Sequence, residues 1–191
     1  YSLDLVQRLV PETFKFSVLT EITNRLFIDR NSRKSGLTEC PTLSKGTPRL
    51  RRFLHSKLFM QATSVLREDT VDEGLVPVGV LKSFDDYMRL LYSNSYFDFT
   101  EMINLAVQFL EGDPGQDEEA RMVQAHISED IRYVVVDEYQ DVNPLQERLV
   151  KGLTTFGANL CVVGDDDQTI YQWRGSEVTN ITRAMNALNI R

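Results

Sequence analysis

Two acidic residues, Asp137 and Glu138, directly follow a short apolar run, Tyr133–Val136. A third, Asp165, lies just beyond a second such run, Leu160–Val163. Short continuous apolar runs that are rich in β-branched residues are typical of strands buried on both faces of a parallel sheet. Because ligands bind beyond the carboxyl ends of the strands in open α/β sheets, we expect these carboxylates at the mouth of a site.

These carboxylates could act on a nucleotide and its metal ion. A carboxylate at a strand end can hold Mg²⁺, which prefers oxygen ligands and keeps several waters beside nucleotide phosphates. A neighbouring carboxylate can polarise an attacking water, since phosphoryl transfer depends mainly on positioning and charge neutralisation. Taken alone, however, an Asp-Glu pair is more often a solvated strand end, so the surrounding residues must decide.

Two longer strings surround these acids. The first is VDEYQD at 136–141, and the second is GDDDQTIYQWRG at 164–175. They resemble motifs II and III of the UvrD/Rep/PcrA-like superfamily 1 DNA helicases, whose patterns are D-E-[FY]-Q-D (a Walker B motif) and G-D-x-x-Q-x-I-Y-x-W-R-G. Two motifs of this length, in this order and at a short spacing, make the resemblance specific.

The resemblance implies a role for each matching residue in ATP hydrolysis. Asp137 would bind the Mg²⁺ of MgATP, and Glu138 would activate the hydrolytic water. Gln168 would sense the γ-phosphate and couple it to the DNA site. The cofactors implied are therefore ATP and Mg²⁺.

Three further residues of the second string would lie along single-stranded DNA: Tyr171, Trp173 and Arg174. Aromatic faces stack on bases of any identity, each worth about 1–3 kcal/mol, and an Arg adds charge and cation–π contact. Without the family pattern, the two aromatic residues would be interpreted as core residues and the arginine as a surface charge.

The composition is that of a globular chain with no membrane segment. Among its 191 residues 42% are hydrophobic and 26% are charged, and no apolar run approaches the roughly 20 residues that span a bilayer. No basic-then-apolar signal segment opens the chain. Cys40 and Cys161 are too few and too far apart for a disulfide framework, and Cys161, within a predicted strand, is expected to be a buried free thiol. These features favour a cytoplasmic protein.

The charge is unevenly distributed. The net charge of −7 alone argues against nucleic-acid binding, but residues 1–66 contain 11 Lys and Arg against 5 Asp and Glu, whereas residues 67–191 contain 10 against 23. One segment of the basic part has no acid between its positive residues, which are Lys45, Arg49, Arg51, Arg52 and Lys57. This segment is either a phosphate-contacting patch or a solvated helix face.

The first part of the sequence predicts helices. A first helix is predicted to end before Pro11. A second begins near Thr20, with Ile22 and Leu26 on one face, and a third begins at Pro48, with an apolar stripe that includes Leu54 and Leu58. Two pairs resemble capping boxes that open later helices: Ser83 with Asp86, and Asp98 with Glu101. Further on, Asn143, Pro144 and Gln146 mark the start of a helix between the two apolar runs, and Ser176 can cap a last helix.

The fold class indicated is α/β: an all-helical first part, then strand–helix–strand–helix. A short βαβ crossover implies a parallel, right-handed unit, and two strands cannot complete a doubly wound sheet. The resemblance implies that residues 1–95 form a mainly helical, 1B-like insertion subdomain. Residues 96–191 would be the C-terminal half of a RecA-like P-loop NTPase domain (1A).

The chain has no Gly-Lys dipeptide and therefore no G-x-x-x-x-G-K-[ST] phosphate loop. In the resembled family, that loop would lie upstream of Tyr1 and the second RecA-like domain downstream of Arg191. We therefore expect a fragment, inactive by itself, of an ATP-dependent DNA helicase or translocase that moves 3′ to 5′ in DNA repair or replication. Its partners would be single-stranded DNA, single-strand/duplex junctions and the remainder of the helicase.

Three alternatives stay open. The parent protein could be a helicase–nuclease subunit, with its nuclease domain outside this chain. The chain could instead be a non-catalytic module that binds single strands or a partner protein, although its intact Asp137, Glu138 and Gln168 argue against such decay. A generic α/β domain with chance motif matches is the third alternative.

Overall fold

A computed structural model describes residues 2–39, 48–68 and 71–165, which divide into two compact units. The inserted unit is Glu12–Met102, and the split unit consists of the described parts of Tyr1–Pro11 and Ile103–Arg191. The sequence predicted a single division between residues 95 and 96. The observed units differ because the chain leaves the split unit after Pro11 and returns to it at Ile103.

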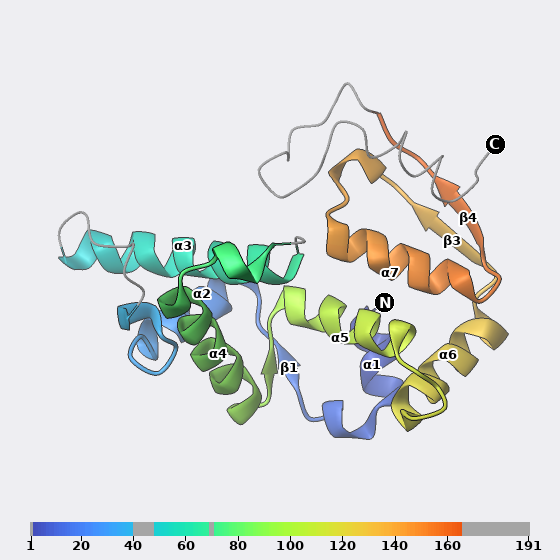
Figure 1. Cartoon of the computed structure of the whole chain (residues 1–191), viewed down its shortest axis with the longest axis horizontal. Helices are drawn as coiled ribbons and strands as arrows, with labels where there is room; N and C mark the ends of the chain where they lie inside the picture. Colours follow the sequence, from blue (N-terminus) through green and yellow to red (C-terminus); the bar gives the residue numbers. More distant parts are fainter. Residues whose placement is uncertain (1, 40–47, 69–70, 166–191) are drawn as a thin grey trace. The chain divides into compact units, whose positions relative to one another are not determined.

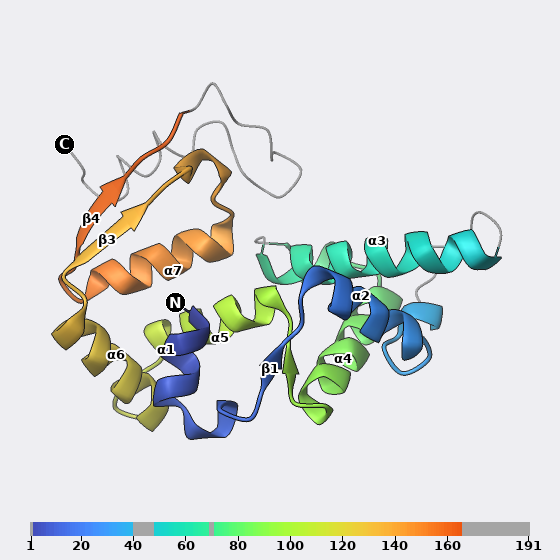
Figure 2. The same ribbon diagram turned by 180° about the vertical axis from the view of Figure 1, so that it is seen from behind.

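The inserted unit is built mainly from helices. Its elements are α2 (Glu21–Arg30), α3 (Pro48–Glu68), α4 (Val78–Ser93), the first residues of α5 (Phe99–Glu111), the 3-10 turns η2 (Leu37–Glu39) and η3 (Glu73–Leu75), and the strands β1 (Ser17–Val18) and β2 (Tyr96–Phe97), with η1 (Pro11–Thr13) at its start. Figure 2 shows α2 running beside α3. Because β1 and β2 pair in parallel, the prediction that the first part is all-helical is wrong in this detail.

The core of the inserted unit contains Ile28, Leu37, Phe59, Tyr87 and Leu91. Aliphatic residues that the helical patterns placed on one face of α2 or α3 lie outside this core and are 41–73% exposed: Ile22, Leu26, Leu54 and Leu58. Among the side chains of α3 that the structure describes, from Leu54 onward, the buried ones recur at helical spacing as Ser56, Phe59, Thr63 and Arg67. The core-facing side of this part of α3 is therefore largely polar, which an apolar stripe cannot reveal.

Ser83 does not open a helix, as predicted, but lies inside α4. Its buried hydroxyl hydrogen-bonds to the carbonyl oxygens of Gly79 (2.9 Å) and Gly36 (3.0 Å). Gly36 has a φ of +76°, and a Cβ on it would lie 2.6 Å from the Ser83 Cα. A close approach of two backbones thus explains why small residues stand at both positions.

A buried ionic network connects α3, α4 and α5. The Arg67 guanidinium donates to both carboxylate oxygens of Asp98 (2.7 and 2.6 Å) and to Glu101 (3.3 Å). The Tyr87 hydroxyl donates to the same Asp98 carboxylate at 2.6 Å. Asp98 also caps α5, as predicted, since it accepts the Glu101 backbone N–H at 2.8 Å. The Glu101 side chain, for which the sequence predicted only capping, also accepts from Tyr92 at 2.7 Å.

The split unit contains the predicted strand–helix–strand segment. Its elements are α1 (Ser2–Leu9), most of α5, α6 (Glu118–Asp130), β3 (Tyr133–Val136), η4 (Tyr139–Asp141), α7 (Pro144–Thr155) and β4 (Asn159–Val162). β3 and β4 lie side by side and pair in parallel, from Tyr133↔Asn159 to Val136↔Val162, as predicted (Figure 1). The predicted start of α7 is confirmed: Asn143 and Gln146 form a capping box and Pro144 is the first helical residue.

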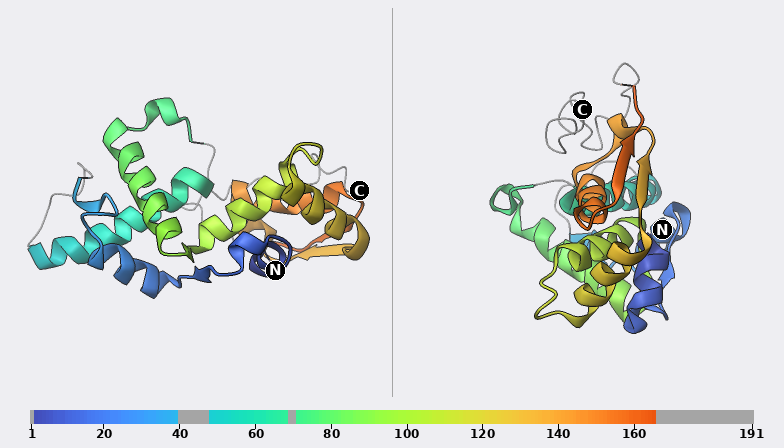
Figure 3. Two further views of the ribbon diagram at one scale, coloured as in Figure 1. Left: turned by 90° about the horizontal axis from the view of Figure 1, so that it is seen from below. Right: turned by 90° about the vertical axis from the view of Figure 1, so that its right-hand side faces the viewer.

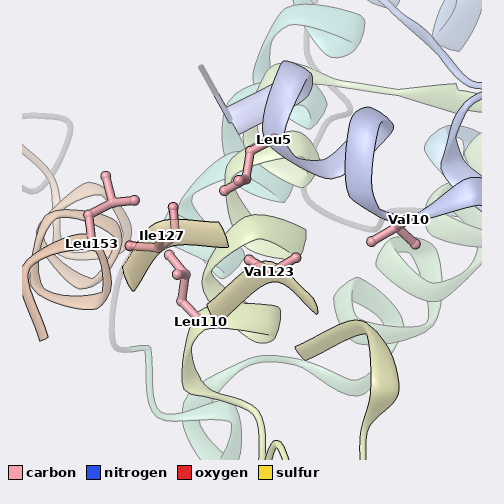
Figure 4. Packing of buried hydrophobic residues seen from close by; sticks show 6 residues of the cluster. All are labelled: Leu5, Val10, Leu110, Val123, Ile127 and Leu153. Atoms are coloured by element: carbon pink, nitrogen blue, oxygen red, sulfur yellow. The ribbon is translucent and has the colours of Figure 1, made fainter. Parts of the chain in front are cut away.

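The core of the split unit joins residues from both ends of the chain. Figure 4 shows its buried cluster, drawn from α1 to α7: Leu5, Val10, Leu110, Val123, Ile127 and Leu153. Helices α1 and α6 contact each other directly. Residues 2–11 therefore belong with the later part of the chain, although nothing in their sequence indicates this return.

Among the described residues, helix α7 covers one face of the β3–β4 pair and no other helix covers the opposite face. α7 lies on one side of the pair (Figure 3, right). Burial alternates along both strands, leaving Tyr133 76% exposed and Val135 69% exposed. Cys161, on the same face as Val135, is a free, exposed cysteine. The predictions that both faces are buried and that the Cys161 thiol is buried are therefore wrong for this structure.

No helix within the described ranges combines the length and the apolar character required to cross a membrane.

Candidate active site

The predicted carboxylates lie where β3 and β4 both end, at the carboxyl-terminal edge of the strand pair. Two backbone hydrogen bonds join the strands at this edge, from the Val163 N–H to the Val136 carbonyl (2.8 Å) and from the Tyr139 N–H to the Val163 carbonyl (3.0 Å). The three acidic residues that follow the strands are all exposed: Asp137, Glu138 and Asp165. The structure thus brings together the acids that the sequence placed at one edge.

Glu138 has a left-handed backbone conformation, with φ 53° and ψ 43°. Such a conformation costs a residue other than glycine roughly 1–2 kcal/mol, so local bonds must hold it. The Glu138 N–H donates to Asp137 Oδ1 (2.9 Å), and its carbonyl accepts the Asp141 N–H (2.9 Å). The turn reverses the chain after β3, leaving Glu138 exposed while the next two residues are buried.

Gln140 lies beneath this turn, with only 1% of its surface exposed. Its Nε2 donates to Glu138 Oε2 at 2.5 Å, and its Oε1 accepts the Asp165 backbone N–H at 2.9 Å. One amide therefore connects the residues that follow β3 with those that follow β4. The sequence interpretation gave Gln140 no role, although it stands at a fixed position in the D-E-Y-Q-D pattern.

Tyr139 is the other buried residue of the turn, with 1% of its surface exposed. Within the described part of the chain its hydroxyl has no hydrogen-bond partner. Burial, followed by the nearby Glu147 carboxylate, raises the pKa of Tyr139 to about 12. Tyr139 therefore packs below the turn, and its hydroxyl does not act as an acid or a base near neutral pH.

The donors at this edge suit a metal ion that arrives with a nucleotide. Among the described residues, no group of three or more His, Cys, Asp or Glu side chains is arranged to hold a metal ion. Mg²⁺ that is bound with a nucleotide needs only one or two protein carboxylates, because phosphates and waters complete its shell. An exposed Asp137 at a strand end fits that requirement, whereas the residues described there form no metal cage from protein side chains alone.

The other predicted site residues lie outside the described residues: Gln168, Tyr171, Trp173 and Arg174. The same holds for Lys45 of the basic segment and for the helix predicted from Ser176. Lys57 is exposed on α3, but one lysine does not distinguish a phosphate contact from a solvated helix face. The roles of these residues stay predictions.

Comparison with known proteins adds independent information. The family described as "UvrD/REP helicase N-terminal domain" matches residues 52–189. The chain is 40% identical over 98 residues to the "ATP-dependent DNA helicase PcrA" of Bacillus subtilis (strain 168), and equally to that of Staphylococcus aureus (strain Mu50). In each case the match covers 51% of this chain and 12% of the relative, so the chain spans a small part of these relatives' length.

Proposed function

This chain belongs to the UvrD/REP helicase N-terminal domain family, and on that premise we propose that it is the part of an ATP-dependent DNA helicase that activates the hydrolytic water. The observation that carries the proposal is the edge of the β3–β4 pair. There, exposed Asp137 and Glu138 follow β3 next to Asp165 after β4. That placement is the one at which an α/β sheet binds a ligand.

In the proposed reaction, Asp137 would hold the Mg²⁺ that arrives with ATP, and this ion would supply charge neutralisation at the phosphates. Glu138 accepts a proton from the attacking water, and Gln168 senses the γ-phosphate. Because Glu138 is exposed, its carboxylate is accessible to a substrate. The isolated chain is inactive in this proposal, because it has no Gly-Lys dipeptide for a phosphate loop.

The proposed DNA-binding residues are Tyr171, Trp173 and Arg174, which contact single-stranded DNA or a single-strand/duplex junction. Stacking and charge at these positions suit binding without sequence preference. The proposal includes 3′ to 5′ movement in DNA repair or replication, in the cytoplasm. The names of the matched PcrA relatives support an ATP-dependent DNA helicase, and the finer points rest on the motif resemblance.

The proposal also assigns the two units. The inserted unit is 1B-like, and the split unit is part of the RecA-like domain 1A. An insertion into the chain of the split unit and a parallel strand–helix–strand segment support this assignment. The exposed face of the β3–β4 pair, with Tyr133 and Val135, suits a sheet that further elements would complete.

Replacing Glu138 by Gln in the full-length protein tests the proposal. We expect MgATP binding to change by less than about threefold, while DNA-stimulated ATP turnover falls by at least about 100-fold, because the water loses its proton acceptor. Turnover is measured with oligo-dT, and binding with a fluorescent ATP analogue and Mg²⁺.

Glu129→Gln is the matched control, since Glu129 is an exposed residue at the end of α6, and it should leave turnover unchanged. Turnover that survives in Glu138→Gln would remove Glu138 from the reaction. A wild-type protein that binds oligo-dT and hydrolyses no ATP would instead be the non-catalytic binding module.

A further inference from the structure

We propose that Gln140 is a positioning residue, which holds the Glu138 carboxylate in a fixed place relative to the end of β4. The inference rests on the proposed function of Glu138. It goes beyond that function because it assigns a role to a residue that does not touch the nucleotide.

Two hydrogen bonds, to Glu138 and Asp165, indicate the orientation of the Gln140 amide. Nε2 can only donate, and it faces a carboxylate oxygen of Glu138; Oε1 can only accept, and it faces the Asp165 N–H. Turning the amide over would oppose oxygen to carboxylate and NH₂ to N–H, and so break both bonds. Because the residue is buried, water is a poor replacement for either bond.

Glu138 requires such a partner. Its side chain is exposed and has several rotatable bonds, so the carboxylate would otherwise sample many positions. A water-activating base must be held within a fraction of an ångström of its productive position. A hydrogen bond from a buried donor to the charged carboxylate restricts Glu138 without covering it.

The second bond makes the position of Glu138 depend on β4. The Gln140 Oε1 is bound to the first acidic residue after β4, Asp165, and the Tyr139 N–H is bound to Val163 beside it. A displacement of the residues after β4 would therefore move the Gln140 amide and, through it, the Glu138 carboxylate. Asp165 belongs to the string at 164–175, which carries the proposed γ-phosphate and DNA residues.

Two variants of the full-length protein separate the two bonds. Gln140→Met keeps the approximate volume and removes both bonds. Gln140→Glu keeps the shape and an acceptor for the Asp165 N–H, but it replaces the donor to Glu138 with a carboxylate. We expect both variants to lower kcat for ATP about 10- to 100-fold, with the KM for ATP changed less than about threefold.

A buried glutamine on another element, with no hydrogen bond to the site among those described, provides the matched control. Gln124 on α6 donates to the carbonyl oxygens of Phe109, Leu110 and Gly112. Gln124→Met should lower the melting temperature and leave kcat unchanged. This comparison separates a loss of positioning from a general loss of packing.

A double variant distinguishes positioning from a purely structural link. If Gln140 acts through Glu138, then Gln140→Met should change the residual single-turnover rate of Glu138→Gln by less than about twofold. Full multiplication of the two effects would overturn the inference. A wild-type kcat in Gln140→Glu would also overturn the inference. The Gln140→Glu variant therefore still tests the inference if Gln140→Met does not fold.

The proposed function can fail separately. If the wild-type protein hydrolyses no ATP, or if Glu138→Gln retains turnover, the proposed function is wrong and the inference falls with it. If Glu138→Gln is inactive and the Gln140 variants keep the wild-type kcat, only the inference is wrong.

Discussion

Glu138 shows how much of the site is determined by its neighbours. The string D-E-Y-Q-D identifies which residue types stand after β3, and the sequence predicted that Asp137 and Glu138 would lie at the strand end. It could not predict the left-handed backbone of Glu138, which bonds to Asp137 and Asp141 hold, or the position of its carboxylate, to which Gln140 donates. Two of these bonds come from side chains whose orientation depends on the folded turn.

Replacing Tyr139 by Phe should leave the chain equally stable or stabilise it by up to about 1 kcal/mol at pH 8, because a buried, unpaired hydroxyl is removed. The pKa of Tyr139, raised by burial to about 12 in the folded chain, makes the difference pH-dependent. A raised folded-state pKa contributes stability below pH 10, the ordinary tyrosine value, and that contribution is lost between pH 10 and 12.

The advantage of Tyr139→Phe should therefore grow by about 1 kcal/mol from pH 8 to pH 11. Urea denaturation at the two pH values measures it, and comparison with the wild type cancels the titration of the other tyrosines. A variant that is less stable than the wild type at both pH values would show that the hydroxyl has a partner.

Among the elements, those with strong local signals were predicted well. The bounds of β3 are those predicted, β4 is displaced by one residue, and the Asn143 capping box is formed. Elements whose burial depends on neighbours were predicted less well. The two-residue strands β1 and β2 have no sequence signal, because each exists only through its pairing with the other.

The cap of α7 permits a prediction at this scale, because α7 is the helix between β3 and β4. Asn143→Ala should destabilise the chain by about 1 kcal/mol, since the Gln146 N–H loses its acceptor at the helix start. Asn143→Asp is the matched control and should be close to wild type, because it keeps the acceptor and places a negative charge at the helix N-terminus. Thermal denaturation measures both, and equal stability of the two variants would contradict the prediction.

At the scale of the whole chain, two units are formed from three stretches of sequence. Hydrophobic patterns showed helices at both ends of the insertion, but they could not show which helices share a core. Leu5 and Val10 join the cluster around Ile127, more than 100 residues away in sequence. The interior of the inserted unit differs from that of the split unit, because the buried ionic network lies beside its apolar core.

That network predicts a stability difference that depends on pH. Although burial opposes its charge, Arg67 lowers the pKa of Asp98 below the usual value. A lowered folded-state pKa contributes stability above about pH 4, the ordinary aspartate value, and this contribution is lost as the pH falls through the folded-state pKa. Arg67→Met leaves the Asp98 carboxylate buried without a counter-ion, so we expect a loss of about 3–5 kcal/mol at pH 7.

The loss caused by Arg67→Met should shrink as the pH falls from 7 towards 3, because Asp98 in the variant becomes protonated and is then no longer a buried charge, while the wild type loses the contribution of its lowered Asp98 pKa. Arg121→Met is the matched control: Arg121 pairs with Glu118 on the surface of α6, so its loss should cost less than about 0.5 kcal/mol at any pH. Urea denaturation of both variants from pH 7 to pH 3 measures these differences. A loss for Arg67→Met that stays constant over this range would show that packing of the long side chain, and not its charge, stabilises the inserted unit.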